Sequence, residues 1–440
     1  MQKPFLVLFT AVLSAAMWIW VQAIAVPHQQ AESAAREAPR GNLSDLYPRW
    51  LGARELLLHH RDPYGDDITQ EIQIGYYGRV LDPSRPNDPK DQQAFAYPIY
   101  VVLMLAPSVR FSFGRIHNVF FWIFGLLTAI SVSLWLRTLR WRIPSAEKLM
   151  WVLLVLSCFP SIQGLKLLQL SVLVAALIAA CMFCVSRHRF FLAGLMLALA
   201  TIKPQLVFLL VLWLCIWVGG NWRARQWLAW SFVFSMTALV IAGELLLPGW
   251  IHEFRIAMSS YYRYTGGGNS VLDVVLTPTF GRLTAALLIG ILLAFAWSSR
   301  REDESSPSFQ YLLSLTLATT LLVIPMFAPY NQVLLVPAFM IFLRSLPQLW
   351  SRNRLSRFFV SITAASICWP FLAGASLVSA LAFLPGPMVQ KAWGLPFYPS
   401  FAIPITIYAM LLSSRSVLSS GQNAPAAAQS QTLQPSAASE

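Results

Sequence analysis

Isolated cationic and amide side chains between long apolar runs are the first candidates for chemistry in this chain of 440 residues. Lys203, in the sequence TIKPQ, is the sharpest case, because an ammonium group between two apolar runs is costly unless it reaches water or meets an anion. Pro204 favours an extended conformation at Lys203 and interrupts the helix there. Lys166 and Gln169 lie at the boundary between two neighbouring apolar runs, on the neighbouring outer loop. These residues are candidates for anion binding, and a lysine anchor that reaches to the membrane surface is the alternative for Lys203.

Carboxylates, which can act as general bases, are concentrated in one segment of the chain. Eleven of the 19 acidic residues lie between Glu32 and Asp91. This polar segment follows directly on an apolar N-terminus, and it contains the sequence NLSDLYPRWLGARELLLHHRDPY. An active site that depends on a carboxylate is therefore expected on the side of the molecule where this segment lies.

The elements that must position these residues are membrane-spanning helices. Hydrophobic residues make up 57% of the sequence and charged residues only 12%, and the mean hydropathy is +0.58. A soluble domain carries about a quarter charged residues, and a spanning helix needs roughly 20 largely apolar residues. The sequence predicts an all-α polytopic membrane protein of about twelve spans, within a range of about 10 to 13. The predicted spans are Phe5 to Val26, Ile116 to Leu136, Leu149 to Ile162, Leu167 to Val185, Phe190 to Ile202, Leu206 to Val218, Leu228 to Leu247, Leu283 to Trp297, Tyr311 to Pro325, Val333 to Leu343, Phe358 to Leu381 and Phe401 to Leu412.

The positions of Lys and Arg predict the orientation of these spans, because short cytoplasmic loops retain basic residues. If the spans alternate as above, the basic clusters fall on one side together with Lys3 and Arg415, so both termini are expected in the cytoplasm. The net charge of +13 is then mostly a topology signal, and no nucleic-acid partner is expected. The clusters are Arg137, Arg140, Arg142 and Lys148; Arg187 and Arg189; Arg223 and Arg225; Arg300 and Arg301; and Arg344, Arg352, Arg354 and Arg357.

This topology divides the chain into four parts. Residues 1–26 are the first transmembrane helix, with a cleaved signal peptide as the alternative, and residues 27–115 form a large extracytoplasmic loop. Residues 116–414 contain the other spans, and residues 415–440 are expected to be a disordered cytoplasmic tail of low complexity. Within the loop, Leu46 to His60 has the periodicity of an amphipathic helix along the membrane surface. The short apolar run from Tyr97 to Val109 is expected to be an interfacial or re-entrant helix.

Several motifs in this order resemble glycosyltransferase family 87, whose members are polytopic enzymes of the GT-C architecture. The motifs are an acidic residue after the first span, RDPY, AYPIYVVLMLAPSV, LLQLSVL, LAGLMLALATIKPQLVFLL and APYNQVLLVPA. The resemblance runs from about Phe5 to Pro337. Here the family's usual Tyr-Pro-Pro is Tyr97-Pro98-Ile99, its usual Gly-Gln is Leu168-Gln169, and Asn331 stands where some members carry His or Asp.

The resemblance implies a catalytic role for Asp45, because GT-C enzymes place an acidic residue at the start of the first outer loop. An acceptor hydroxyl must lose its proton as it attacks the anomeric carbon, and a positioned base typically contributes about 10²- to 10⁴-fold to such a step. In an inverting displacement the lipid phosphate leaves without protonation, so one carboxylate is enough, unlike the pair of a glycoside hydrolase. The alternative is that Asp45 only caps the helix that follows it.

Some family members use polyprenyl-phosphate-mannose, so the resemblance also implies that a donor phosphate needs cations near the outer surface. Lys203, Arg49 and Lys166 are the candidates for that role, since Arg can bind phosphate through two hydrogen bonds. An arginine such as Arg49 is otherwise solvated or paired with an acidic side chain or a lipid headgroup. Candidates for contacts with the sugar are Tyr64, Tyr97, Gln169, Tyr330, Asn331 and Gln332; a plain turn explains the last three as well, and an interfacial aromatic belt explains the tyrosines.

No cofactor or metal site is expected from the sequence. Cys181 and Cys184 form a CxxC inside a predicted span without further ligands nearby, and no glycine-rich phosphate motif is present. A divalent metal requirement is left open. The expected partners are a polyprenyl-phosphate-sugar donor, a glycolipid, glycan or protein acceptor, and membrane lipid, and the cysteine pattern and the lone sequon at Asn42 favour a bacterial inner membrane.

The sequence thus predicts a glycosyltransferase that moves a hexose, such as mannose, to an acceptor on the outer face. The alternative is a transporter or lipid flippase for envelope glycolipid precursors, and an inactive scaffold is a third class. A transporter would show inverted repeats and polar groups at mid-membrane, whereas this sequence keeps its polar residues at one surface. The loop from Gly249 to Pro278, rich in Tyr and Gly, could shape an acceptor groove.

Overall fold

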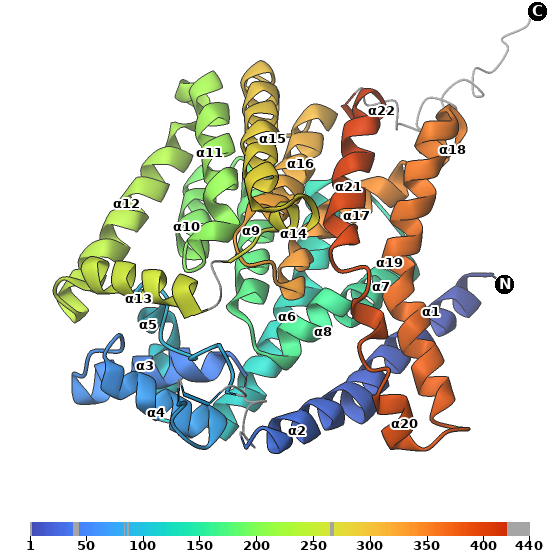
Figure 1. Cartoon of the computed structure of the whole chain (residues 1–440). Helices are drawn as coiled ribbons and strands as arrows, with labels where there is room; N and C mark the ends of the chain where they lie inside the picture. The colour runs from blue at the N-terminus through green and yellow to red at the C-terminus, as the bar shows by residue number, and fades with distance from the viewer. Residues whose placement is uncertain (1, 38–43, 83, 86–87, 265–267, 420–440) are drawn as a thin grey trace, which may run out of the picture.

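A computed structural model describes residues 2–37, 44–82, 84–85, 88–264 and 268–419 (Figure 1). The described residues are 78% helical and form no strand. The sequon at Asn42 and most of the predicted tail lie outside the described residues; Arg415–Ser419 form a short helix, α22. The prediction of an all-helical protein is confirmed.

Six helical segments are long and apolar enough to cross a membrane, by length and composition, and two further pairs of helices qualify if each bent pair is one span. These counts apply to the described part of the chain and make the protein an integral membrane protein. The first segment, Pro4–Ala35, combines α1 (Gln2–Ile19), a π-helical turn (Trp20–Ala25) and α2 (Val26–Ala35). The others are α6 (Phe113–Thr138), α12 (Trp222–Leu246), α15 (Pro278–Ser298), α19 (Arg354–Ala380) and Gly386–Ser413, which contains α20 (Gly386–Gln390), the 3-10 turn Leu395–Phe397 and α21 (Ala402–Ser413).

The two bent pairs have breaks of 57° and 63°. The first is α7 (Ser145–Ser157) with α8 (Phe159–Lys166), and the second is the 3-10 helix Pro329–Leu335 and α17 (Val336–Arg344) with α18 (Leu346–Arg352). Four shorter apolar helices complete the set: α9 (Leu170–Ser186), α10 (Phe190–Ala200), α11 (Pro204–Gly220) and α16 (Pro307–Val323).

Each of the twelve predicted spans overlaps one of these segments, but their number as spans stays a prediction. A helix of 17 residues, such as α9, rises only about 26 Å at 1.5 Å per residue, whereas a bilayer core is about 30 Å thick. Helix α16 is buried over 14 of its residues, from Phe309 to Leu322. Of the shorter helices, α9 and α16 are the most deeply buried in the bundle.

Glycine at position 194 allows α10 and α12 to approach closely. A Cβ atom at Gly194 would lie 2.4 Å from the carbonyl oxygen of Leu228 and 2.7 Å from the amide nitrogen of Phe232. Ser231 of α12 donates a hydrogen bond to the carbonyl oxygen of Phe191 in the same crossing, at 2.6 Å. Small residues at helix crossings in membranes allow this kind of backbone contact.

Gly194→Ala is therefore expected to lower the melting temperature, because the added methyl group meets backbone atoms that cannot rotate away. Gly125→Ala in α6 is the matched control, since a Cβ atom there meets nothing within 4 Å. Alanine also has a higher helix propensity than glycine. Thermal unfolding of the two variants in the same detergent measures the difference. Equal melting temperatures would show that the α10–α12 crossing tolerates separation.

The large outer loop folds into α3 (Leu46–His59), α4 (Asp66–Tyr77), α5 (Val101–Leu105) and a 3-10 turn (Ala106–Ser108). The helix predicted from Leu46 to His60 is present, but it is covered on more than one side. Nine of its residues are buried, because α4 and α5 pack against it. The run from Tyr97 to Val109 contains only the short helix α5 and its 3-10 extension, and the first span continues as helix to Ala35 rather than ending at Val26.

The predicted basic clusters gather at one end of the bundle, and contacts between distant loops hold them there. Arg344 donates to the carbonyl oxygen of Leu139 at 2.7 Å, and Arg225 donates to that of Arg300 at 2.9 Å. At the other end of the bundle, α9 and α11 begin, and α12 leads into α13 (Trp250–Tyr264) and α14 (Val271–Leu276). In Figure 1 this second end also carries α3 and α4.

Candidate functional site

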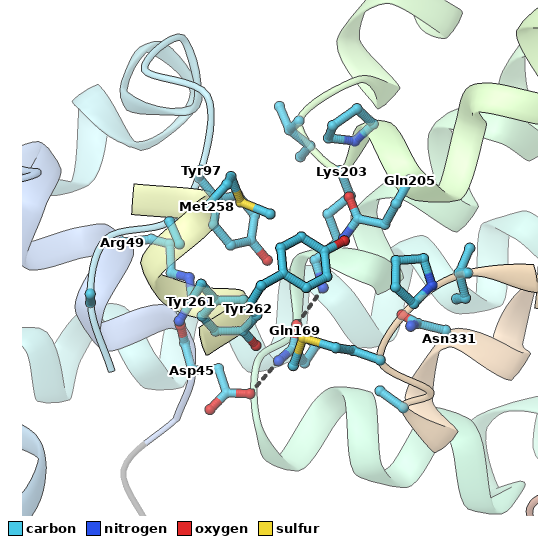
Figure 2. Close-up of a pocket in the computed structure, with 18 of the residues that line it drawn as sticks. Asp45, Arg49, Tyr97, Gln169, Lys203, Gln205, Met258, Tyr261, Tyr262 and Asn331 are labelled. Carbon is cyan, nitrogen blue, oxygen red and sulfur yellow. Dashed lines mark hydrogen bonds between the residues drawn. The ribbon is translucent and has the colours of Figure 1, made fainter. Parts of the chain in front are cut away.

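A cavity of about 520 Å³ lies where the outer-loop helices meet the ends of the central helices. The loop after α4, helix α13 and the segment from Ile324 to Asn331 form its walls (Figure 2). Seven of the ten residues predicted for the site line this cavity: Asp45, Arg49, Tyr97, Gln169, Lys203, Tyr330 and Asn331. The structure thus brings together residues that are far apart in the sequence.

Three of these residues form a continuous chain of hydrogen bonds from a carboxylate to an ammonium group. The side-chain amide of Gln169 donates through Nε2 to Oδ2 of Asp45, and its Oε1 accepts from Nζ of Lys203 at 2.6 Å. Figure 2 shows both bonds as dashed lines. Because the amide must present its NH₂ group to the carboxylate and its oxygen to the ammonium, both partners impose the same orientation of Gln169.

Each of the same three residues also stands immediately before a helix. Asp45 precedes α3, Gln169 precedes α9 and Lys203 precedes α11, and none of their side chains caps its own helix. The first amides of a helix have no intrahelical partner, and the helix dipole makes this end partly positive. Three helix N-termini therefore converge on the cavity, an arrangement that favours the binding of an anion.

Asp45 is half-buried, and its contacts hold the carboxylate at the cavity wall. Its backbone amide donates to the carbonyl oxygen of Leu167 at 2.8 Å, which ties the start of α3 to the turn before α9. Oδ1 accepts a long hydrogen bond from the hydroxyl of Tyr76 at 3.4 Å. The side chain of Asp45 makes no hydrogen bond that caps α3. The alternative role of Asp45 as a helix cap is therefore not seen in this conformation.

Lys203 is the buried cation of the cavity, with 6% of its surface exposed. Its Nζ also donates to Oγ of Ser171 at 2.8 Å, and that hydroxyl donates to Oδ1 of Asn331 at 2.6 Å. The Nζ atom lies 5.2 Å from the centre of the Tyr330 ring and 5.8 Å from that of Tyr97. Burial lowers the pKa of Lys203, because the charged form loses hydration. Its direct partners are neutral groups, so the ammonium charge is available to an anion in the cavity.

Arg49 supplies a second buried cation close to Tyr97. Its guanidinium carbon lies 4.6 Å from the centre of the Tyr97 ring, and its NH1 donates to the backbone carbonyl of Asp45 at 2.7 Å. Desolvation alone would lower the pKa of Arg49, but Tyr97 and Asp45 outweigh it and the pKa is raised. Its Nε has no hydrogen-bond partner among the described residues. The guanidinium therefore keeps one unsatisfied buried donor beside the cavity.

Three of the predicted site residues do not line the cavity. Lys166 donates to the side-chain oxygen of Gln29 in α2. The hydroxyl of Tyr64 donates to the backbone carbonyl of Tyr97 at 2.6 Å, so it supports a cavity residue without facing the cavity. Gln332 points away from the cavity, and its side-chain amide donates to the carbonyl oxygen of Ser400 at 2.5 Å. Their direct contact with a substrate stays a prediction.

The structure also adds residues that were not predicted individually. Tyr261 and Tyr262 of α13 face the cavity, as do Gln205 and Asp91 (Figure 2 for the first three). The richness of the 249–278 loop in Tyr was the available signal for α13. Asp91 is the second carboxylate of the cavity: both its oxygens accept from Gln93, through the backbone and side-chain amides at 3.0 and 2.8 Å, and burial raises its pKa.

Among the described residues, no group of three or more His, Cys, Asp or Glu side chains is placed so that it could hold a metal ion. Together these features define an integral membrane protein with a polar cavity at one end of its helical bundle, and this cavity contains a carboxylate and two buried cations.

The model of glycosyltransferase family 87 matches residues 95–325. This match covers more than half of the chain, and the chain therefore belongs to that family and is a glycosyltransferase. Membership implies a sugar donor and a glycoconjugate acceptor. No curated protein and no solved structure shows significant similarity to the chain.

Proposed function

We propose that this enzyme transfers a hexose, with mannose as the first candidate, from a polyprenyl-phosphate donor to an acceptor at the extracytoplasmic face of a bacterial inner membrane. Both termini would then lie in the cytoplasm, as the basic clusters at the opposite end of the bundle suggest. The observation that carries the proposal is the cavity in which Asp45 is connected through Gln169 to the buried ammonium of Lys203.

The donor phosphate would bind near Lys203 and Arg49. The two cations lie 4.6 and 5.8 Å from the centre of the Tyr97 ring, and Lys203 has no carboxylate among its hydrogen-bond partners. A buried cation is costly unless a counter-charge is present. A phosphodiester would supply that charge, and the N-termini of α9 and α11 would add their own positive potential. The lipid chain would leave the cavity toward the membrane.

The reaction would be a single displacement at the anomeric carbon. The acceptor oxygen forms the new glycosidic bond while the bond from the anomeric carbon to the phosphate oxygen breaks, and the phosphate leaves with the bonding electrons. Asp45 accepts the proton of the acceptor hydroxyl. Lys203 and Arg49 stabilise the additional negative charge on the departing phosphate, where positioned cations have the largest effect. The configuration at the anomeric carbon is inverted in this scheme.

Helix α13 would form the acceptor side of the cavity. Tyr262 lies at the cavity wall opposite the segment that carries Lys203 and Gln205 (Figure 2). Aromatic rings present flat apolar surfaces with a polar hydroxyl at the edge, which suits a sugar ring. Tyr262→Ala is therefore expected to raise KM for the acceptor by about 2- to 12-fold, a loss of about 0.5–1.5 kcal/mol, with little change in KM for the donor.

The control for this variant is Tyr398→Ala, which removes an exposed tyrosine outside the cavity (71% exposed). Tyr262→Phe should retain most of the affinity if the ring makes the contact. Steady-state kinetics with the acceptor varied at saturating donor gives the two constants. An effect on donor KM alone would place Tyr262 on the donor side instead.

The proposal as a whole is tested by transfer of radiolabel in proteoliposomes from polyprenyl-phosphate-hexoses, with nucleotide-activated hexoses as parallel donors. Labelled glycoconjugate should form only with the lipid-linked donors. Formation from nucleotide sugars alone would contradict the proposed donor. Movement of a labelled lipid across the membrane without bond formation would instead support the flippase alternative.

A further inference from the structure

A second hollow lies at the basic end of the bundle, remote from the candidate active site. It has a volume of about 690 Å³ and lies between the C-terminal ends of α6 and α9 and the start of α7. We name it the basic groove, because five cationic side chains line it and no acidic side chain does: Arg137, Arg140, Arg142, Lys148 and Arg187.

These five charges have no ion-pair partner among the described residues. Other arginines at this end of the bundle are used in the fold: Arg225 and Arg344 donate to backbone carbonyls of neighbouring segments, at 2.8 and 2.7 Å. The cations of the basic groove make no such side-chain contact within the described chain. The positive-inside rule explains their side of the membrane, but it does not explain why five of them converge on one hollow.

The inner wall of the basic groove is apolar. Leu136, Trp141, Ile143 and Phe183 line it, and Trp141 packs edge-on against Trp151 with ring centres 5.7 Å apart. Tryptophan is enriched at the level of the lipid headgroups. A hollow with a cationic rim and an apolar wall fits a lipid headgroup together with the first part of its chains, and it fits a free inorganic anion less well.

Arg140 occupies a backbone conformation that is unusual for its side chain. Its φ is +52°, and it follows the C-terminus of α6, where the amide of Trp141 donates to the carbonyl oxygen of Leu136 at 2.9 Å. Glycine is the usual residue at this position of a helix end, because it adopts the left-handed conformation without strain. An arginine here is therefore not explained by the local backbone.

We infer that the basic groove binds a phospholipid whose headgroup carries two phosphates. Basic pockets between transmembrane helices on the cytoplasmic side are suited to such headgroups. A single phosphodiester carries one negative charge, whereas five cations in one hollow can neutralise two, and the arginines can bind phosphate oxygens through paired hydrogen bonds. This lipid would hold together the ends of α6, α7 and α9, and the inference does not depend on the proposed reaction.

The test uses the full-length protein in nanodiscs with a phosphatidylcholine background. One set contains cardiolipin and the other contains phosphatidylglycerol at equal total charge, and native mass spectrometry with thermal unfolding reports retained lipid and stabilisation. The variant is Arg137→Gln/Arg140→Gly/Arg142→Gln, in which glycine suits the backbone at position 140. The control, Arg223→Gln/Arg301→Gln/Arg354→Gln, removes the same charge from exposed positions outside the groove.

The wild-type protein and the control variant should retain cardiolipin in preference to phosphatidylglycerol. The groove variant should bind cardiolipin about 10- to 100-fold more weakly, because each basic residue near the surface contributes to the attraction of anionic headgroups. It should also lose the cardiolipin-dependent rise in melting temperature. Equal weakening in both triple variants would overturn the inference, and so would equal retention of both lipids by the wild type. Displacement of cardiolipin by inorganic pyrophosphate at similar concentration would show that the groove recognises a soluble diphosphate instead.

Discussion

Asp45→Asn is expected to lower kcat for sugar transfer by about 10²- to 10⁴-fold, which is the usual contribution of a positioned general base. The substitution keeps the shape of the side chain and an oxygen that can accept from Gln169, so the hydrogen-bonded chain to Lys203 can persist. It removes the group that accepts the proton of the acceptor hydroxyl. Donor affinity should change little, because the cations and helix N-termini remain in place.

The cavity provides its own control for this experiment in Asp91. Both oxygens of Asp91 already accept hydrogen bonds from Gln93, and burial raises the pKa of Asp91, which disfavours the charged form. Asp91→Asn should therefore cost much less activity than Asp45→Asn. Single-turnover transfer, with donor binding measured separately, distinguishes loss of chemistry from loss of affinity. If Asp91→Asn were the more severe variant, the base would have to be reassigned to Asp91.

Lys203→Met is expected to weaken donor binding by about 10- to 150-fold, since a hydrogen bond to a charged group is worth about 1.5–3 kcal/mol. Methionine is unbranched and apolar, so it fills much of the same space without the charge. The melting temperature of the donor-free protein should change little, because loss of an unpaired buried charge offsets the loss of the contacts to Gln169 and Ser171.

Lys391→Met is the matched control, since Lys391 is an exposed lysine that does not line the cavity. It should leave the dissociation constant of the donor nearly unchanged. Equilibrium binding of a non-transferable polyprenyl-phosphate-sugar analogue measures both variants. Equal weakening in the two would mean that general positive charge, rather than a contact of Lys203, attracts the donor.

The pH dependence of donor binding follows from the same residue. Burial lowers the pKa of Lys203 below its usual range. Donor affinity in the wild type should therefore fall as the pH rises through this lowered pKa, and Lys203→Met should lack that fall. The donor-free protein should respond in the opposite sense: its stability rises in the same pH window, because the unfolded chain still binds the proton that the folded chain has released.

Much of this architecture follows from local sequence. Long apolar runs specify helices, and the alternation of basic clusters specifies which ends lie together, because burial in lipid and charge retention act on short segments. The positions of Asp45 and Lys203 at polar breaks were evident for the same reason: polar groups between apolar runs must lie at a surface or meet a ligand. The periodicity that predicted the helix α3, observed at Leu46–His59, is also a local feature of the sequence.

The site itself depended on packing between segments that the sequence keeps far apart. Gln169 joins Asp45, 124 residues before it, to Lys203, 34 residues after it. No periodicity encodes such a contact, since it arises from how α3, α9 and α11 pack. Packing also placed α13 with its tyrosines at the cavity, covered α3 with α4 and α5, and turned Lys166 and Gln332 away. The sequence by itself determined a membrane bundle with a polar outer segment, and the tertiary structure decided which polar residues share one cavity, because only three-dimensional packing brings distant helix N-termini together.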